Sequence, residues 1–384
     1  MTVYKNRLGT VMKPLPIIAI AGGDPAGVGP QVALEAALAS LRGRRCVPVI
    51  FTAARCAAAT RAWREAGRLV EVVGTFGEAV RGSRDRRRLW IVEVETPGAE
   101  AIRRGRPSEE AAAAAMRSLR KATEAVMAGE AAALVTAPVS KAWMSRIEPF
   151  PGHTEWLASA AGLPPDDVVM AFIGRKMAVA TVTRHLPLRT VPEALRADAI
   201  VKAVVLLGAS LLLDLRRRRV RMGVCSLNPH ASDGGLLGDD EERIVDPAVR
   251  LCREALARAG WERKISLAGP GGADGIMRQM SLGLLDAAVA MYHDQAMIAA
   301  KVMEPLSCAG ITLGLPFIRT TPMHGTAFDI AGKGRPSASS TLAAVALAAN
   351  IARRGSAFLR ELDRVRGLIA GLTRRGSPAL GGRG

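Results

Sequence analysis

Histidines are the residues of this chain whose positions most clearly suggest chemistry. Three of the five directly follow apolar stretches typical of buried strands: His185 in TRHLPL, His230 in NPHASDGG and His293 in AMYHDQ. In an open α/β sheet, functional groups gather where strands end and loops begin. Three neutral imidazoles that converge on one point would bind zinc or a similar divalent ion and leave coordination positions open for a substrate. A catalytic metal site is therefore one interpretation of these histidines.

The spacing of the three histidines does not force them together. They lie far apart in the sequence, unlike the two histidines of an HExxH motif on one helix. A hydrogen-bonded structural role for each histidine therefore stays open beside the metal interpretation. The other two histidines, His153 in PGHTEW and His324 in MHGTAFD, also lie in motif-like contexts.

Strand-like and helix-like stretches alternate along the chain and must position these side chains. Apolar runs predict strands at 16–23, 47–53, 89–95, 132–138, 220–227, 264–270, 287–293 and 311–316, and a hairpin of 168–174 with 177–183. Helical spacing predicts helices at 31–41, 53–67, 107–131, 190–215, 241–259, 273–285 and 337–355, with Ser108 as an N-cap. This alternation is typical of an α/β fold with a largely parallel sheet and helices on both faces.

Two glycine-rich stretches each join a strand to a helix. GGDPAGVGP (22–30) could present backbone N–H groups to an anion, although its spacing is not the GxGxxG fingerprint and a tight turn explains it equally well. In LAGPGGADG (267–275), Asp274 stands where a helix begins, so an N-cap role is its simplest interpretation.

Composition limits the class of protein. The 384 residues suffice for two domains, and the net charge is +18. The arginine runs at 84–88 and 216–219 are typical of solvated loops, and no nucleic-acid motif accompanies them. The positive electrostatic field of the protein would also favour the binding of an anionic small substrate. The five scattered cysteines form no CxxC pair.

Neither a membrane-spanning run nor a signal peptide is recognisable, so we expect a soluble cytoplasmic protein without nucleic-acid or membrane partners.

An ordered set of motifs resembles the 4-hydroxythreonine-4-phosphate dehydrogenase family of vitamin B6 biosynthesis. The resemblance covers roughly residues 16 to 350, and no single motif decides it. Its motifs are GGDPAGVGP, TAPVSKAW, FPGHTEWLA, TRHLPL, SLNPHASDGG, GPGGAD, AMYHDQ, GITLGLPFIRT and HGTAFDIAGKG.

The resemblance implies a fold and an assembly. The family is similar to the isocitrate and isopropylmalate dehydrogenases, with two α/β/α domains and a cleft between them. We expect residues 1–140 and 315–384 to form the first domain and 141–314 the second. The resemblance also implies a homodimer with the active site at the subunit interface. His185 and His230 of one subunit and His293 of the other would bind a divalent metal such as zinc, cobalt or magnesium.

The resemblance further implies a reaction and the residues that perform it. A phosphorylated small molecule, 4-phosphooxy-L-threonine, would be oxidised by NAD or NADP to a β-keto acid, which decarboxylates to 3-amino-2-oxopropyl phosphate in pyridoxine 5'-phosphate biosynthesis. Lys301, with Asp274 and Asp294, matches the catalytic positions. The matching substrate-binding positions are His153, Thr154, Lys301, Gly310 and Arg319. The sequence assigns no residue to the nicotinamide cofactor.

Several positions depart from the family pattern. Gly310 stands where an asparagine is usual, Met323 replaces an aspartate, and Ser232 with Asp233 replaces Gly-Glu. The missing amide at Gly310 leaves open an alternative substrate without the amino group, threonate or erythronate 4-phosphate, under the same chemistry. A basic nucleic-acid-binding module on a decayed enzyme scaffold is a further alternative, but it predicts lost ligands and clustered basic residues, whereas the histidines are intact and the arginines dispersed.

Overall fold

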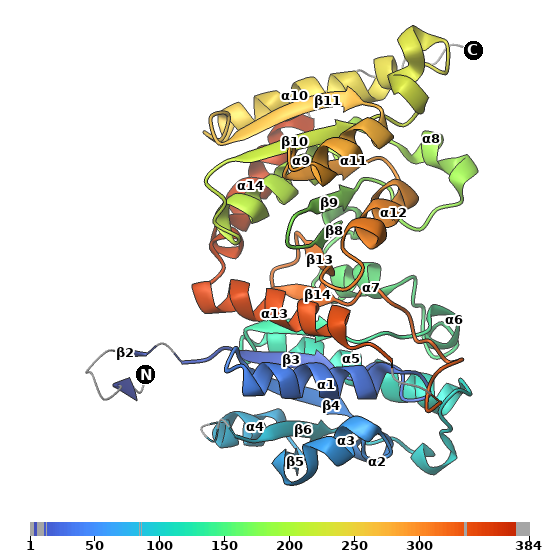
Figure 1. Ribbon diagram of the computed structural model, residues 1–384, viewed down its shortest axis with the longest axis vertical. Helices are drawn as coiled ribbons and strands as arrows, with labels where there is room; N and C mark the ends of the chain where they lie inside the picture. Colours follow the sequence, from blue (N-terminus) through green and yellow to red (C-terminus); the bar gives the residue numbers. More distant parts are fainter. Residues whose placement is uncertain are drawn as a thin grey trace. The chain divides into compact units, whose positions relative to one another are not determined.

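The computed structural model describes residues 4–5, 11–12, 14–83, 85, 87–333 and 336–373 (Figure 1). The chain divides into two compact units. Unit 1 contains Met1–His153 and Phe317–Gly355, and unit 2 contains Thr154–Pro316 and Ser356–Gly384. Near the start of the chain, β1 (Tyr4–Lys5) and β2 (Val11–Met12) pair antiparallel.

Unit 1 is built on a parallel sheet. Its strands lie in the order β14 (Arg319–Thr321), β7 (Ala133–Thr136), β3 (Ile17–Ala21), β4 (Val47–Thr52), β6 (Leu89–Glu93) and β5 (Val70–Val73). Every residue of β4 and β7 is buried, so both faces of these strands are covered, as is usual for parallel sheets.

Helices supply that cover in unit 1. Helix α1 (Gly29–Arg42) packs against α13 (Ser339–Arg354), and both contact the sheet, while α5 (Glu109–Met127) packs on β3, β4 and β7 (Figure 1). Ser108 caps α5 by accepting a hydrogen bond from the N–H of Ala111, which confirms the predicted N-cap. The shorter helices are α2 (Ala54–Ala58), α3 (Arg61–Ala66), α4 (Phe76–Gly82) and α6 (Lys141–Met144).

Unit 2 contains a mixed sheet. Its strands lie in the order β11 (Ile265–Gly271), β10 (Val220–Cys225), β12 (Ala287–Ala290), β9 (Ala178–Thr181), β8 (Val169–Ile173) and β13 (Ala309–Leu313). The first four strands of this order are parallel, whereas β8 runs antiparallel to both β9 and β13. The predicted hairpin of β8 and β9 is therefore confirmed.

Two groups of helices cover the sheet of unit 2. Helices α9 (Ala197–Leu213), α10 (Asp246–Arg258) and α14 (Ala357–Thr373) pack together, and α9 contacts most of the strands. A second group, α11 (Ala273–Ser281) and α12 (His293–Met303), packs on β10, β12 and β9. The remaining helices are α7 (His153–Ala160) and α8 (Val191–Ala194). The expected α/β/α layering is confirmed, and together with the relatives described below it establishes the fold class.

The structure departs from the expected elements where polar side chains interrupt apolar runs. The helix expected at 53–67 is broken because Thr60 accepts a hydrogen bond from the N–H of Trp63 and caps a new helix. The helix expected at 190–215 is broken between α8 and α9, where Leu195 and Arg196 are extended. The sequence analysis also missed β5, β14, α4, α6, α7 and α14.

Helix α14 belongs to the second unit, whereas the sequence analysis assigned residues 315–384 to the first domain. The buried carboxylate of Asp214, at the end of α9, accepts hydrogen bonds from the hydroxyl of Ser356 at 2.9 Å and from the N–H of Phe358 at 3.1 Å. This carboxylate therefore holds the start of α14 on α9. Residues 141–153 group with unit 1 by their contacts. The domain boundaries themselves stay a prediction.

In the described part of the chain, no single helix is long and apolar enough to cross a bilayer, and α13 and α14 meet the criterion only when they are counted together as a broken pair.

Candidate active site

The three histidine-bearing loops of unit 2 follow neighbouring parallel strands. Strand β12 lies between β10 and β9 and pairs in parallel with both. His185 lies beyond the end of β9, His230 beyond β10, and His293 opens α12 directly after β12. Because the carboxyl ends of parallel strands meet at one edge of a sheet, these loops all begin at that edge.

The imidazole rings of His185 and His293 lie side by side in one chain. Their centroids are 5.3 Å apart and their planes are inclined by 45°. With metal–nitrogen bonds of about 2.0–2.1 Å, each centroid would lie roughly 3.2 Å from a shared ion, so this separation permits both rings to bind the same ion. A cavity of about 160 Å³ is lined by both rings and by Asp294. The two imidazoles fit part of the ligand set of a divalent ion, which requires at least one further ligand.

Asp294 orients the ring of His293. Its Oδ1 lies 2.7 Å from Nδ1 of the imidazole. In the neutral ring, a proton on Nδ1 donated to this carboxylate leaves the lone pair of Nε2 available to a metal. Asp294, predicted as a catalytic residue, thus contacts a predicted metal ligand.

Hydrogen bonds tie the three strand ends together. The hydroxyl of Thr183 donates to the carbonyl of Met291 at 2.8 Å and links the segment before His185 to the segment before His293. Gln295 extends the link, because its Oε1 accepts from the N–H of Met291 at 2.8 Å while its Nε2 donates to the carbonyl of Ser226 at 3.0 Å. The ends of β9, β12 and β10 are therefore joined through buried backbone groups.

His230 lies in a turn of unusual backbone conformation. It has a φ of +53°, in the left-handed region that residues other than glycine rarely adopt, and its side chain is exposed. Among the described residues of a single chain, no group of three or more His, Cys, Asp or Glu side chains is arranged to hold a metal ion. The structure therefore pairs His185 with His293 and leaves His230 outside that pair.

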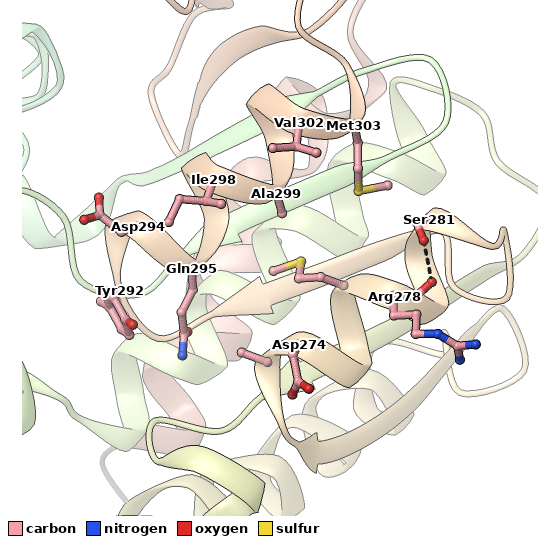
Figure 2. Close-up of a pocket in the computed structure, with 12 residues that line it drawn as sticks. Asp274, Arg278, Ser281, Tyr292, Asp294, Gln295, Ile298, Ala299, Val302 and Met303 are labelled. Carbon is pink, nitrogen blue, oxygen red and sulfur yellow. Dashed lines mark hydrogen bonds between the residues drawn. The ribbon is translucent and has the colours of Figure 1, made fainter.

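A larger pocket opens between α11 and α12 (Figure 2). Its volume is about 400 Å³, and apolar side chains such as Ile298, Val302 and Met303 supply much of its lining. Asp274 and Asp294 line it from the first turns of α11 and α12. Asp274 is the second residue of its helix and makes no side-chain cap, so the N-cap interpretation is wrong.

Lys301 lies further along α12. Its side chain is exposed, and it is absent from the lining of the pocket that contains Asp274 and Asp294. Within the chain, Lys301 forms no ion pair with either carboxylate. The structure thus brings the two predicted acids to one pocket and leaves the predicted lysine outside it.

Arg319 forms the centre of a buried polar group in unit 1. It lies on β14 and is only 3% exposed. Its Nη2 and Nε donate to Oγ1 of Thr136 at 2.7 and 3.2 Å, which fixes the guanidinium against β7. A buried, oriented guanidinium is well suited to bind a phosphate or carboxylate.

His153 is a neutral imidazole in the same unit. Burial, followed by the positive charges of Arg319 and Lys141, holds its pKa well below the usual 6.5. The edge of the ring packs against Phe150 with centroids 5.5 Å apart. Although the residue keeps some exposed surface, Nε2 is buried and has no protein hydrogen-bond partner. A buried atom of this kind is usually satisfied by water or a ligand. Thr154, the next residue, is 5% exposed.

The positions that depart from the family pattern have clear structural settings. Gly310 is buried in β13, opposite Phe172 of β8, and contributes no side chain. Met323 donates its backbone N–H to the hydroxyl of Ser340 at 2.8 Å. A backbone contact of this kind does not depend on the side chain, so it accommodates the replacement of aspartate by methionine.

The loop at 22–30 is a tightly packed turn. A Cβ added to Gly22 would lie 2.8 Å from Cβ of Thr52, and one added to Gly29 would lie 2.7 Å from the carbonyl oxygen of Gly22. Within the turn, Asp24 is 1% exposed and accepts the N–H of Ala26 at 2.9 Å. Burial raises the pKa of Asp24 to about 6. These contacts favour the interpretation of this stretch as a turn.

Sequence reasoning missed the residues that position the histidines. Thr183 and Gln295 lie within the histidine motifs TRHLPL and AMYHDQ, but only the strand order reveals that they join three strand ends. Arg184, directly before His185, donates to Glu155 of the GHTE motif at 3.0 Å. The two motifs lie far apart in the sequence, so no local pattern indicates this pairing.

The chain is similar to known proteins over most of its length. The family model described as Pyridoxal phosphate biosynthetic protein PdxA matches residues 44–348. A curated relative from Xanthobacter autotrophicus, named 4-hydroxythreonine-4-phosphate dehydrogenase, is 38% identical over 89% of this chain and 95% of its own. A crystal structure of a protein of that name from Klebsiella pneumoniae is 32% identical, covers 88% of this chain and 99% of its own, and has a TM-score of 0.70.

A second solved relative carries a different name. The terephthalate 1,2-cis-dihydrodiol dehydrogenase from Burkholderia xenovorans is 26% identical, covers 87% of this chain and 98% of its own, and has a TM-score of 0.57. The fold and these relatives place the chain among the α/β oxidoreductases. The chain belongs to the Pyridoxal phosphate biosynthetic protein PdxA family.

Proposed function

We propose that the chain is a 4-hydroxythreonine-4-phosphate dehydrogenase of pyridoxal phosphate biosynthesis. The observation that carries the proposal is the pairing of His185 with His293 at the edge of a parallel sheet. Curated relatives with this name match the chain over most of its length. The substrate is 4-phosphooxy-L-threonine, and the product is a β-keto acid that decarboxylates to 3-amino-2-oxopropyl phosphate.

The residues of unit 1 are assigned to substrate binding. The buried guanidinium of Arg319 holds an anionic group of the substrate, and its bonds to Thr136 keep it oriented. The neutral ring of His153 offers its buried Nε2 as a hydrogen-bond partner without adding charge. Thr154 and Gly310, which belong to unit 2, are also assigned to substrate contacts.

The histidines of unit 2 are assigned to a divalent ion, zinc, cobalt or magnesium. When bound, the ion supplies Lewis acidity at the substrate hydroxyl, and NAD or NADP accepts the hydride. His185, His230 and His293 would hold the ion, and the contact with Asp294 would keep the Nε2 atom of His293 available. Lys301 is assigned to deliver the proton that replaces CO₂ at the substrate carbon, and Asp274 is assigned to the same reaction without a contact to Lys301 within one chain.

A homodimer in the cytoplasm is part of the proposal. Helix α12 exposes Ile298 at 66% and Val302 at 77%, one turn apart on the same face, and Leu306 beyond its end is 61% exposed. Apolar side chains at such exposure are favoured at protein–protein contacts. Because α12 begins at His293, a second copy docked on this face would lie beside the proposed metal site.

Turnover measurements with purified enzyme test the proposal. 4-Phosphooxy-L-threonine should reduce NAD or NADP and release CO₂, with a kcat/KM well above that for threonate or erythronate 4-phosphate. The two nicotinamides should be compared in the same assay. A clear preference for the phosphates without an amino group would contradict the proposed substrate and point to the missing amide at Gly310 as the cause.

A further inference from the structure

The loop that carries His230 forms a left-handed turn. The φ angles of His230, Ala231, Ser232, Asp233 and Gly234 are +53°, +52°, +67°, +45° and +68°. Only the last of these residues is a glycine, and consecutive left-handed residues with a Cβ are strained. Such a conformation persists only where neighbouring groups hold it, and it is concentrated at functional sites.

Glu241 holds both sides of this turn. Its side chain is 3% exposed, and its Oε1 accepts the backbone N–H groups of Leu227 at 2.7 Å and Asn228 at 2.9 Å. Its Oε2 accepts the side-chain amide of Asn228 at 3.0 Å and the hydroxyl of Ser232. These donors lie before and after His230, so a single carboxylate fixes the two ends of the segment that presents the imidazole.

The surrounding hydrogen bonds favour the charged form of the Glu241 side chain, which accepts hydrogen bonds at both oxygens. Burial raises the pKa of Glu241, but the hydrogen bonds from Ser232 and Asn228 outweigh burial and leave the pKa below its ordinary value. Glu241 also opens a π-helical turn, Glu241–Val245, that leads into α10. Such turns are frequently found at functional sites.

Ser232 makes this arrangement particular to this chain. The family pattern usually has glycine at this position, and glycine adopts a φ of +67° without strain. Serine adds backbone strain but donates a hydrogen bond to Glu241 that glycine cannot make. The hydroxyl therefore stabilises the conformation that its own Cβ disfavours.

We propose that Glu241 is a positioning residue for His230, and that it acts by holding the left-handed turn through Leu227, Asn228 and Ser232. The inference rests on the proposed metal role of His230. Glu241 touches neither substrate nor metal; it fixes where the imidazole is presented. Loss of such supporting contacts typically weakens metal affinity roughly 10- to 100-fold.

Metal affinity in isolated variants tests this directly. Wild type, Glu241→Gln, Ser232→Ala, Ser232→Gly and His230→Ala would be freed of metal, and zinc binding measured by competition with a chromophoric chelator. Glu242→Gln is the matched control, since it makes the same change at the exposed neighbouring residue. The visible spectrum of the cobalt form, kcat and KM, and thermal unfolding without metal would be recorded for each variant.

The variants are expected to differ in zinc affinity in a defined order. Glu241→Gln replaces a hydrogen-bond acceptor by a donor that faces the side-chain amide of Asn228. Zinc should therefore bind roughly 10- to 100-fold more weakly, and the cobalt spectrum should change. The loss in kcat should be larger than the change in KM for substrate. Ser232→Ala keeps the strain and loses the bond, so it should bind zinc more weakly than Ser232→Gly. Glu242→Gln should match wild type.

Two outcomes separate this inference from the proposed function. If His230→Ala binds zinc as well as wild type, the metal site itself is wrong and the inference falls with it. If His230→Ala loses binding but folded Glu241→Gln equals Glu242→Gln, only the inference is overturned. Should Glu241→Gln fail to fold, equal zinc affinities of Ser232→Ala and Ser232→Gly would overturn it instead.

Discussion

The imidazoles of His185 and His293 stand 5.3 Å apart within a single chain, although more than a hundred positions separate them in the sequence. The adjacency of β9 and β12 and the bond from Thr183 to Met291 produce this proximity. The family resemblance, in contrast, assigns His293 to the ion of the partner subunit. A single chain is therefore able to present the pair, and the source of the third ligand becomes an experimental question.

Mixing two inactive variants decides between these arrangements. His185→Ala and His293→Ala should each lose at least a hundredfold in kcat. If His293 acts across the dimer, mixed dimers contain one intact site, and randomly mixed subunits should recover about a quarter of wild-type activity. Steady-state turnover after denaturation and joint refolding measures this. Refolded mixtures without recovered activity would instead place both histidines in one site of one chain.

Removal of the buried guanidinium of Arg319 in unit 1 should impair substrate binding. Arg319→Met leaves Thr136 without its donor and removes the charge offered to the phosphate or carboxylate, so KM should rise at least tenfold. Arg319→Lys should recover only part of this loss, because an ammonium lacks the planar fork. Arg64→Met, at an exposed position of the same unit, is the control. Unchanged KM in Arg319→Met would remove Arg319 from the substrate site.

His153 should make the protein less stable in mild acid. Its folded-state pKa lies well below 6.5, so the unfolded chain takes up a proton as pH falls through 6.5 while the folded chain does not. Stability should therefore be full above that pH and decline below it, by at most about 1.4 kcal/mol per pH unit. Thermal unfolding of His153→Gln between pH 5 and 7.5 should show a flatter profile than wild type. Parallel profiles would contradict a neutral buried imidazole.

Asp24 should have the opposite dependence on pH. Its folded pKa of about 6 exceeds the ordinary value of 3.8, so its stabilising contribution is full below 3.8 and is lost as pH rises through about 6. Asp24→Asn keeps an oxygen for the N–H of Ala26 and cannot ionise. The variant should gain up to about 3 kcal/mol over wild type at pH 7.5 and little at pH 4. Denaturant unfolding at both pH values measures the gain, and an equal effect at both would refute the assignment.

A charge on the exposed face of α12 should disrupt the proposed dimer. Val302→Asp introduces a carboxylate at a position that is 77% exposed in the single chain, so the monomer should fold normally. Analytical ultracentrifugation should show a shift towards monomer, with a loss of activity that higher protein concentration partly restores. Leu284→Asp, at an exposed position outside α12, is the control. A wild-type sedimentation profile for Val302→Asp would exclude this face as the interface.

Much of the fold could be predicted because its strands are continuous apolar runs. β3, β4, β7 and β10 lie where such runs occur, and Ser108 marks the start of α5. The missed strand β5 is only partly buried, so its sequence lacks that signal. Helix α14 was missed although its buried residues recur at helical spacing: Phe358, Leu362, Val365, Ile369 and Leu372. Its attachment to the second unit could not be predicted, because it depends on the long-range contact with Asp214.

The candidate site could be predicted by residue type but not by geometry. Strand-end histidines were visible in the sequence, whereas the pairing of His185 with His293 depends on the order of β9, β12 and β10. The left-handed turn at His230 could not be foreseen, because serine and aspartate replace the glycine and glutamate that are usual there. Tertiary hydrogen bonds to Glu241 override this local preference.

Metal-dependent turnover of 4-phosphooxy-L-threonine tests the central claim most directly. Enzyme treated with a chelator should lose NAD(P)-linked oxidation and CO₂ release, and stoichiometric zinc or cobalt should restore both to wild type but not to His185→Ala. Full activity in enzyme shown by elemental analysis to contain no divalent metal would contradict the account.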